Sequence, residues 1–515
     1  MAFDLILRNG TLIDGTGARD PFPADIGILG DRIAATGCLG PARAAREIDA
    51  SGRHVCPGFI DVHVHSEIAL VEGEDRHAGI RQGVTTQLTA PDGFGWAGLS
   101  PERTREMWEY TRFAVGETEV KPGWPTIDAY LSIFPGNSAS NVYPQVPHCA
   151  LRLAVMGWDP SPASDEQINA MVALAEAWME AGAAGLCLGL DYQPSANADT
   201  RELVALCKAV ASRGGIYAAH QRYHTLGRVA AWEETLELSR LAGIPVHVSH
   251  ERIDDSILAI FERVDREDFD LTFEAYLYPA GMSHLTIMLP VEVQIGPPSE
   301  VIENLKKPEV REKSLPHLKE WLGSCNQIMG YTRSGRYTGR RLADLAAEAG
   351  AAPEAFAYDL VVEEEGVCTY IFPWQVPNQE ADASVARTAV HPRLMIASDG
   401  VYNVPHPHPR GFGCFAQVLG QFVRERKLLS AAQAVHKMSG FPARRFGLAD
   451  RGQIAEGMVA DLVVFDPETV GAGATFEEPR KPPTGIDHVL VNGVPAVERG
   501  HPTGHMAGRV LKRGR

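Results

Sequence analysis

The chain has 515 residues, of which 45% are hydrophobic and 22% charged, and its net charge at pH 7 is −17. These values are typical of a globular protein with one large domain and a smaller one. Nucleic-acid binding needs a basic stripe, and here the Lys and Arg residues are scattered, with only a weak cluster in the last few positions. The eight cysteines include no CxxC pair, so we expect no disulfide framework.

The N-terminal stretch MAFDLILRNG does not read as a signal peptide or an anchor. Asp4 lies within its only apolar segment, and no basic region precedes that segment. No window of the chain approaches the length of a membrane span. We therefore expect a cytoplasmic protein without a membrane partner.

Both ends of the chain consist of short alternating strands separated by turn residues. The N-terminal end reads FDLILRNGTLIDGTG and ADIGILGDRIAATG, and the C-terminal end reads GQIAEGMVADLVVFDPET and GIDHVLVNGVPAVERG. Two distant all-β ends predict one small β-sandwich domain, formed by residues 1–57 and 441–515.

Between these ends, apolar strands alternate with helical stretches, which is the pattern of parallel βα units. Eight candidate strands read CPGFIDVHVH, VTTQLTA, ALRLAVMG, AGLCLGLDY, GIYAAH, IPVHVSH, LTFEAYLYP and LMIASDG. Residues 58–440 are therefore predicted to form a (β/α)8 TIM-type barrel, whose active site would lie at the C-terminal strand ends.

A long segment from about residue 281 to residue 390 separates the seventh candidate strand from the eighth. It contains helical patches and the Pro-rich, Trp-containing stretch YIFPWQVPNQ. Insertions of this length are usually lids or binding elements, so we expect this one to influence specificity.

Four histidines stand at the ends of predicted barrel strands. His63 and His65 are two residues apart on one strand, so both imidazoles point to the same side, while His220 and His250 each end a strand of their own. Any one of them could be a hydrogen-bonded core histidine. Four converging on one rim indicate a site for Zn²⁺, for which neutral imidazole is a common ligand.

Asp399, in the sequence IASDG, ends the eighth predicted strand. A metal ion lowers the pKa of a water that it binds to about 7, and a nearby carboxylate can then carry the proton to a leaving amine. The constellation thus predicts metal-assisted hydrolysis of an amide-like bond. Alternatively, Asp399 only caps the turn before Gly400.

Several long motifs carry a resemblance to known enzymes. HVCPGFIDVHVHSE, the single histidines after strands five and six, and ASDG resemble the amidohydrolase superfamily. More narrowly, the chain is similar to the N-acyl-D-amino-acid deacylase (D-aminoacylase) group in GLDYQPSANADTRELVALCKAVASRGGIYAAH, in the stretch from HPHPRGFGCFAQVLG to MSGFPARRFGLADRG, and in IDHVLVNGVPAVERGHPTGHMAGRVL. The resemblance covers nearly the whole chain and is weakest from about 285 to 385.

This resemblance implies a division of labour among the strand-end residues. His63 and His65 would bind one metal position, His220 and His250 would bind the other, and Asp399 would be the catalytic acid and base. The implied substrate is a linear N-acyl amide next to a carboxylate, first of all an N-acyl-D-amino acid.

Asp92 stands where the group normally has a metal-binding cysteine. The family context after strand two is Gly-Asn-Cys-Gly, whereas this chain has APDGFG. No lysine lies on strand four to serve as a carboxylated bridge, so Asp92 is the remaining candidate to bridge two ions. Zn²⁺ is still expected, although a carboxylate ligand makes Mn²⁺ or another divalent ion more plausible. Alternatively, Asp92 only caps the turn at Gly93, which leaves one metal on His220 and His250.

The resemblance also implies three substrate-binding positions, which correspond to Tyr192, Arg252 and Tyr278. Arginine replaces the lysine expected after the strand-six histidine, and its planar fork suits a carboxylate. Alternatively, Arg252 is structural and pairs with one of its acidic neighbours, Glu251, Asp254 or Asp255.

Two other functions remain open at this stage. One is hydrolysis of a related substrate, such as a cyclic amide or a carbamoyl compound. The other is ligand binding by a catalytically silent relative, since the chain lacks the cysteine ligand. The oligomeric state does not follow from the sequence.

Overall fold

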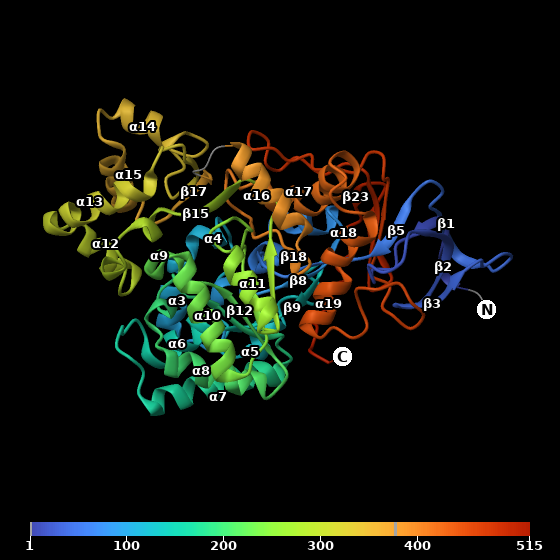
Figure 1. The fold of residues 1–515 in the computed structure, drawn as a ribbon, viewed down its shortest axis with the longest axis horizontal. Coiled ribbons are helices and arrows are strands. Elements are labelled where there is room, and N and C mark those ends of the chain that lie inside the picture. The colour runs from blue at the N-terminus through green and yellow to red at the C-terminus, as the bar shows by residue number, and fades with distance from the viewer. Residues whose placement is uncertain (1–2, 375–377, 515) are drawn as a thin grey trace.

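The computed structural model of the chain describes residues 3–374 and 378–514 (Figure 1). Its centre is a ring of short parallel strands in eight positions. These are β6 Phe59–Asp61 with β7 Val64–His65, β8 Val84–Leu88, β9 Asn141–Tyr143 with β10 Val146–Pro147, β11 Gly185–Gly189, β12 Ile216–His220, β13 Val246–Val248, β14 Leu271–Ala275, and β18 Leu394–Ile396 with β19 Gly400–Val401.

Strand pairing closes this ring. The runs β6-β8-β9 and β10-β11-β12-β13-β14-β18 are parallel throughout, and β19 pairs in parallel with β7. The first, third and eighth positions are each split into two short strands. At each of these positions the two strands belong to different hydrogen-bonded sheets, so the three sheets together complete the ring. The predicted (β/α)8 barrel is confirmed.

The third strand is not where the sequence predicted it. The stretch ALRLAVMG lies in helix α6, His148–Met156, and the strand position is filled by β9 and β10 just before it. A buried helix and a buried strand both give apolar runs, so composition could not separate them. The true strand is interrupted at Pro144 and Gln145 and begins with the buried polar residue Asn141, so its apolar run is too short to stand out in the sequence.

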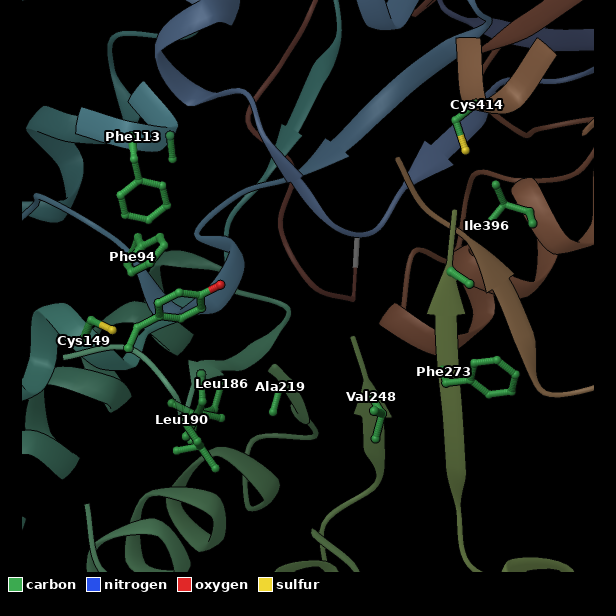
Figure 2. Packing of buried hydrophobic residues seen from close by; sticks show 14 of the residues in the cluster. Phe94, Phe113, Cys149, Leu186, Leu190, Ala219, Val248, Phe273, Ile396 and Cys414 are labelled. Atoms are coloured by element: carbon green, nitrogen blue, oxygen red, sulfur yellow. The ribbon is translucent and has the colours of Figure 1, made fainter. Parts of the chain in front are cut away.

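Side chains alternate between the outside and the lumen of the barrel. Figure 2 shows buried side chains of the outer layer from successive strands, namely Leu186, Ala219, Val248, Phe273 and Ile396. Phe273, for example, packs against Phe261 of α11, with ring centroids 5.3 Å apart.

The lumen-facing residues differ between the two ends of the strands. Near the strand starts, Ile60, Ile216 and Met395 form an apolar cluster that Phe446 and Leu511 join from outside the ring. At the opposite ends the lumen contains polar groups, among them Glu274 and His220. Apolar packing thus closes the floor, and the chemistry lies at the C-terminal strand ends.

Helices surround the strands. Helix α7 begins with a capping box, in which Ser164 and Gln167 each bond the other's backbone N–H, and α8 begins at the N-cap Asp199. The described α-helices outside residues 281–374 are α1 Glu67–Val71, α2 Ala78–Arg81, α3 Pro101–Tyr110, α4 Arg112–Val115, α5 Ile127–Leu131, α6, α7 Asp165–Ala181, α8 Thr200–Ala211, α9 Tyr223–Leu226, α10 Arg228–Ala242, α11 Leu258–Arg266, α16 Asn378–Val390, α17 Arg410–Gln417, α18 Ala431–Met438 and α19 Gly440–Phe446. In the described part of the chain, no helix combines the length and apolar character needed to cross a membrane.

Both chain ends build one nine-stranded sheet. Its strands are β1 Phe3–Leu12, β2 Phe22–Leu29, β3 Arg32–Gly37, β4 Ala44–Asp49, β5 His54–Pro57, β20 Leu462–Phe465, β21 Ile486–Val491, β22 Val494–Glu498 and β23 His501–Pro502. Strand β5 pairs with β20 and joins the two ends, and side chains of both halves, such as Leu7 and Leu490, share one core. The small β domain built from both ends is therefore confirmed.

The exact domain bounds stay a prediction. Residues after the sheet return to the barrel, where the Leu511 N–H donates to the Val142 carbonyl at 2.7 Å. Phe446, at the end of α19, also packs on the barrel floor. Parts of 441–515 thus contact the barrel directly.

The insertion between β14 and β18 forms a structure of its own. Strands β15 Ala280–His284, β17 Cys368–Pro373 and β16 Ile328–Thr332 make an antiparallel sheet, and the helices are α12 Pro298–Leu305, α13 Pro308–Leu322, α14 Leu342–Glu348 and α15 Pro353–Glu363. Figure 1 shows these helices gathered on one side of the molecule, beyond the barrel. Helix α16 packs on the barrel instead, because the Ser384 hydroxyl donates to the Ile253 carbonyl at 2.9 Å.

Candidate metal centre

The C-terminal ends of the strands bring the predicted ligands together. The Nε2 atom of His63 lies 3.6 Å from Asp92 Oδ1 and 3.6 Å from Asp399 Oδ1. The Nε2 atom of His65 lies 3.5 Å from Asp92 Oδ2 and 3.5 Å from Asp399 Oδ1. Two histidines and two carboxylates from three strand ends therefore face one point.

Two sets of three residues within the described chain have ligand atoms close enough to hold an ion. One set is His63, Asp92 and His250, and the other is His63, His65 and Asp399; within each, the ligand atoms lie within 4.8 Å of one another. The two sets share His63. This differs from the expected division, which paired His220 with His250.

His220 stands beside these sets and is already hydrogen-bonded. Its Nε2 atom lies 3.1 Å from Asp191 Oδ2, and its Nδ1 atom lies 3.0 Å from His250 Nε2. Asp191, at the turn after β11, also accepts the backbone N–H of His224 at 3.0 Å. His220 would have to exchange at least one of these bonds to bind a metal.

The unsatisfied atoms of the cluster fit a cation. His63 Nε2 and Asp92 Oδ1 are both buried, and neither has a hydrogen-bond partner in the described structure. Buried polar atoms rarely lack partners, and those that do call for an explanation such as an ion. Among the described residues, Asp92 Oδ1 accepts no backbone N–H, and Asp92 Oδ2 lies 3.5 Å from His65 Nε2, so this carboxylate faces the histidines.

The charges of the cluster also favour a bound cation. Burial by itself lowers the pKa of His63, but the charges of Asp92, Glu274 and Asp399 outweigh it and raise this pKa to about 10. The site therefore has an excess of buried negative charge. A divalent cation held by imidazole and carboxylate groups would neutralise it.

Backbone geometry at the strand ends aims these side chains. Asp92, His250 and Asp399 have φ values of 54°, 38° and 46°. Non-glycine residues rarely adopt such left-handed conformations, and they cluster at functional sites, where the surroundings hold them in place. In the turn that contains Asp92, the Ala90 N–H donates to Glu67 at 2.6 Å.

Glu274, in the barrel lumen on β14, contacts the cluster and was not among the predicted site residues. One of its oxygens lies 3.1 Å from His63 Nδ1 and accepts the His250 backbone N–H at 3.0 Å, while the other lies 2.5 Å from His247 Nε2. Burial raises the pKa of Glu274, but His247 and His63 outweigh this effect and bring it to about 2. The Ser249 hydroxyl also lies 3.2 Å from His63 Nδ1. With Glu274 and Ser249 at Nδ1, the Nε2 atom of His63 is left free for a metal. The sequence feature that could have identified Glu274 is a charged residue at a lumen-facing position of the strand LTFEAYLYP.

Arg410 forms a buried ion pair with Asp399, and this residue was also missed. Arg410 Nη2 lies 2.8 Å from Asp399 Oδ2. Burial would raise the pKa of Asp399, but the charge of Arg410 and the hydrogen bond with His65 hold it well below its ordinary value. One oxygen of Asp399 thus faces the histidines while the other is held by Arg410. The side chain of Asp399 makes no bond to the turn at Gly400.

A cavity of about 780 Å³ opens above the cluster. His65, Asp92, His220, His250 and Asp399 all line it. Pockets of roughly 300–1,000 Å³ hold small-molecule ligands, so the cavity is large enough for an amide substrate.

The three predicted substrate-binding residues lie in different places. Tyr192 lines the cavity, with its ring centroid 4.8 Å from that of His220. Arg252 also lines it and stacks on Trp374, while its Nε lies 3.4 Å from Asp254. The contact with Asp254 that was considered as the alternative therefore exists, and it leaves both terminal nitrogens of Arg252 without an ion pair among the described residues.

Tyr278, the third predicted substrate-binding residue, lies away from the described cavity lining. Its hydroxyl is buried without a hydrogen-bond partner in the described structure, and its ring packs on His408 at 5.3 Å. It is absent from the described cavity lining, where Tyr276 stands instead. Strand β14 ends at Ala275, so Tyr276 is the first residue past the strand and the chain turns before Tyr278.

The insertion supplies much of the remaining wall. Its contribution to the cavity is largely apolar and aromatic and includes Met282, Met288, Trp321, Tyr370, Phe372 and Trp374. Glu320 is the acidic residue that this segment adds to the described lining. The insertion thus forms part of the cavity wall, and its role as a lid stays a prediction.

Comparison with known proteins identifies the relatives of this chain. A sequence profile for the amidohydrolase family matches residues 46–283 and 337–497. The chain belongs to the amidohydrolase family. Between these two ranges, residues 284–336 are unmatched; they belong to the insertion and supply Met288, Glu320 and Trp321 to the cavity wall of this amidohydrolase.

Individual relatives match over nearly the full length. D-aminoacylase from Alcaligenes xylosoxydans xylosoxydans is 36% identical, covering 99% of this chain and 98% of the relative. N-acyl-D-glutamate deacylase from the same organism is 34% identical, covering 99% and 96%. The crystal structure of N-acyl-D-glutamate deacylase from Bordetella bronchiseptica, complexed with zinc and a phosphonate inhibitor, has a TM-score of 0.82 at 32% identity and covers 99% of this chain and 100% of that chain.

Proposed function

We propose that this amidohydrolase is a metal-dependent N-acyl-D-amino-acid deacylase, which cleaves a linear N-acyl amide next to a carboxylate. The observation that carries the proposal is the pair of buried, unpartnered ligand atoms, His63 Nε2 and Asp92 Oδ1, beside the carboxylate of Asp399 under one cavity. The relatives that are deacylases, matched over nearly all of both chains, support the choice of substrate class.

The residues that would hold the metal are His63, His65, Asp92 and His250, with His220 next to them. Zinc is the first ion to test, since the related glutamate deacylase was solved with zinc. When bound, such an ion lowers the pKa of water and polarises the scissile carbonyl. Asp92 in place of a cysteine makes the donor set harder, and Mn²⁺ is the second ion to test.

Asp399 is proposed to move the proton. Its Oδ1 atom lies 3.6 Å from His63 Nε2, and its Oδ2 atom is held by Arg410, so the free side of the carboxylate is directed at the cluster. Because its pKa is held low, Asp399 is ionised at neutral pH and can take a proton from the attacking water. It then delivers that proton to the nitrogen of the leaving amine.

Two guanidinium groups are available for the substrate carboxylate. Arg252 has both terminal nitrogens free of ion pairs, and Arg410 has Nε and Nη1 buried without hydrogen-bond partners, both within the described structure. Tyr192 and Tyr276 line the cavity beside them. A carboxylate is held well by a planar guanidinium fork, so we assign this role to Arg252 with Tyr192, and Tyr276 replaces Tyr278 in the proposed site.

The wall from the insertion indicates which substrates fit best. Met288, Phe372 and Trp374 present an apolar and aromatic surface, and Glu320 would repel a second carboxylate. We therefore expect an N-acyl-D-amino acid with a large neutral side chain to be preferred over N-acyl-D-glutamate or N-acyl-D-aspartate.

A substrate panel with a metal assay tests this function. The zinc-loaded and manganese-loaded enzyme is assayed with N-acetyl derivatives of D- and L-phenylalanine, D- and L-leucine and D- and L-glutamate, and with hydantoins. We expect hydrolysis of the neutral D-substrates. Hydrolysis of hydantoins alone would support a cyclic amidohydrolase, and no hydrolysis by an enzyme with full metal content would support a silent binding protein.

A further inference from the structure

A second hollow lies on the opposite end of the barrel from the metal centre. It has a volume of about 420 Å³ and is lined in part by Ile216 and Leu271, the first residues of β12 and β14. His220, the last residue of β12, is about 13 Å along the strand from Ile216, given a rise of about 3.3 Å per residue. No described residue lines both hollows.

The cover of this hollow comes from the end of the chain. Helix α19 and the tail after the terminal sheet close the floor of the barrel, and Figure 1 shows α19 beside the C-terminal end. Residues of α19 and of the tail supply Phe441, Arg444, Arg445 and Arg513 to the lining, and Arg393 joins them from the turn before β18.

Four arginines and one aspartate thus face a single hollow. Arg445 pairs with Asp270, and Arg393 pairs with the exposed Asp265 at 2.7 Å. Arg444 and Arg513 have no ion pair with any residue in 3–374 or 378–514; Arg513 Nη1 donates to the Ala184 and Phe446 carbonyls. The hollow keeps two unmatched positive charges in a protein whose net charge is −17.

Arg445 adds an independent sign of a missing partner. Its side chain is only 8% exposed, and its Nε atom is buried without a hydrogen-bond partner among the described residues. Burial and the charges of Arg393 and Arg513 lower its pKa from the ordinary value, against the effect of Asp270. The other guanidinium nitrogens of Arg445 donate to Asp270 and to the Val246 carbonyl, so Nε is its one atom without a partner among the described residues. A buried polar atom of this kind calls for an explanation such as a bound anion.

The shape and chemistry of the hollow define a ligand class. Guanidinium groups bind the oxygens of phosphates and carboxylates through paired, charge-assisted hydrogen bonds. The volume lies in the range of small-molecule pockets and exceeds the space that a single ion needs. Phe441 adds a half-buried apolar ring to the lining, and the exposed Arg444 lies over this ring with its Cζ atom 5.3 Å from the ring centroid.

We propose that this arginine hollow is a second binding site, which takes a small organic dianion, either a phosphate monoester or a dicarboxylate. The site is separate from the deacylase reaction, and its ligand contacts Arg444, Arg445 and Arg513. By binding the folded state across the barrel floor, the ligand stabilises the packing of α19 and the tail on the barrel.

Binding of three probes tests the proposal. Inorganic phosphate, glycerol 3-phosphate and succinate are titrated into the metal-loaded enzyme by calorimetry at constant ionic strength, with sodium chloride as the reference salt. We expect saturable binding and a rise in melting temperature for at least one organic dianion. Arg513→Met and Arg444→Met should each weaken this binding about tenfold, because each removes a charged hydrogen-bond donor, and should leave deacylase activity unchanged.

Matched variants distinguish binding in the arginine hollow from binding of the probes elsewhere on the protein. Arg509→Met removes a tail arginine that pairs with Asp31 outside the hollow, and it should bind the probes as the wild type does. Binding at the metal centre would survive Arg513→Met and be lost in Asp92→Ala, and that result would overturn the proposal. So would a melting temperature that rises no more with the three probes than with sodium chloride. Preference for glycerol 3-phosphate over succinate, or the reverse, decides between phosphate esters and dicarboxylates.

Discussion

Asp399 Oδ2 and Arg410 Nη2 lie 2.8 Å apart in a buried ion pair at the rim of the barrel. The pair fixes the carboxylate so that its other oxygen, Oδ1, stands 3.5 Å from His65 Nε2 and 3.6 Å from His63 Nε2. A carboxylate that first acts as a general base must be held in place and be ionised at the working pH, and Arg410 favours both conditions.

Asp399→Asn should abolish most of the activity. The amide cannot accept or deliver the proton, so kcat should fall by about 10²- to 10⁴-fold, the usual contribution of a general acid and base. Metal content should remain at least partial, because His63, Asp92 and His250 form a set that does not include Asp399. The measurement is kcat with metal content and melting temperature as controls. A folded, metal-loaded Asp399→Asn enzyme with wild-type kcat would refute the role of this residue.

Arg410→Met should shift the pH profile. Removal of the positive charge disfavours the ionised form of Asp399, so the pKa of this carboxyl rises and the acidic limb of kcat/KM moves to higher pH, by about one to three units. Arg426→Met is the control, since Arg426 pairs with the exposed Asp382. If the acidic limb of kcat/KM does not move in Arg410→Met, Asp399 is not the group whose ionisation sets that limb.

Glu274→Gln should weaken metal binding without touching a ligand. One oxygen of Glu274 lies 3.1 Å from His63 Nδ1 and the other lies 2.5 Å from His247 Nε2, so the charge of Glu274 favours one orientation of the ligand His63. Loss of such a partner lowers metal affinity by about 10- to 100-fold. Competition with a chelator measures the change, and Glu267→Gln, which alters an exposed pair with Arg240, is the matched control. Equal metal affinity in Glu274→Gln and wild type would contradict this account.

Lys437 should make stability rise with alkaline pH. Burial lowers its pKa to about 8, below the ~10.4 of an unfolded lysine, while its Nζ donates to the His391 carbonyl at 2.5 Å. Below pH 8 both states bind the proton and the cost of burying the charge is complete. Between pH 8 and ~10.4 the unfolded state binds more protons, so the free energy of unfolding gains about 1.4 kcal/mol per pH unit.

The variant Lys437→Met lacks this ionisation. The difference in stability between wild type and Lys437→Met should therefore change in favour of the wild type as the pH rises through this window. Denaturant unfolding of both proteins at several pH values measures it. Parallel curves would show that Lys437 keeps an ordinary pKa.

The parts of the site that could be predicted are those that follow strand periodicity. His63 and His65 are two residues apart on a strand end and therefore face one point, and Asp399 ends the last strand beside them. The same alternation places Glu274 in the lumen of LTFEA, so that residue could have been found from the sequence. The pairing of Asp399 with Arg410 could not be predicted from the sequence, because it depends on how the chain folds back after the eighth strand.

The third strand was misplaced because strand positions are set by tertiary packing. The apolar run ALRLAVMG lies in helix α6, whereas the real third strand is interrupted at Pro144 and contains the buried polar residue Asn141. The family resemblance indicated Tyr278, whereas the residue that lines the cavity is Tyr276, the first residue after β14. His220 likewise ends its strand as expected, and its bond to Asp191 depends on a turn that sequence periodicity does not describe.

The most direct test of the metal centre is the metal-to-protein ratio of wild type and Asp92→Ala, measured by mass spectrometry after equilibration with zinc and removal of free ions. Asp92 lies between His63 and His65, and its Oδ1 atom has no other partner in the described structure. Wild type should retain zinc, and Asp92→Ala should lose at least one equivalent of zinc together with its activity. Unchanged metal content in a folded Asp92→Ala protein would show that Asp92 is not a ligand.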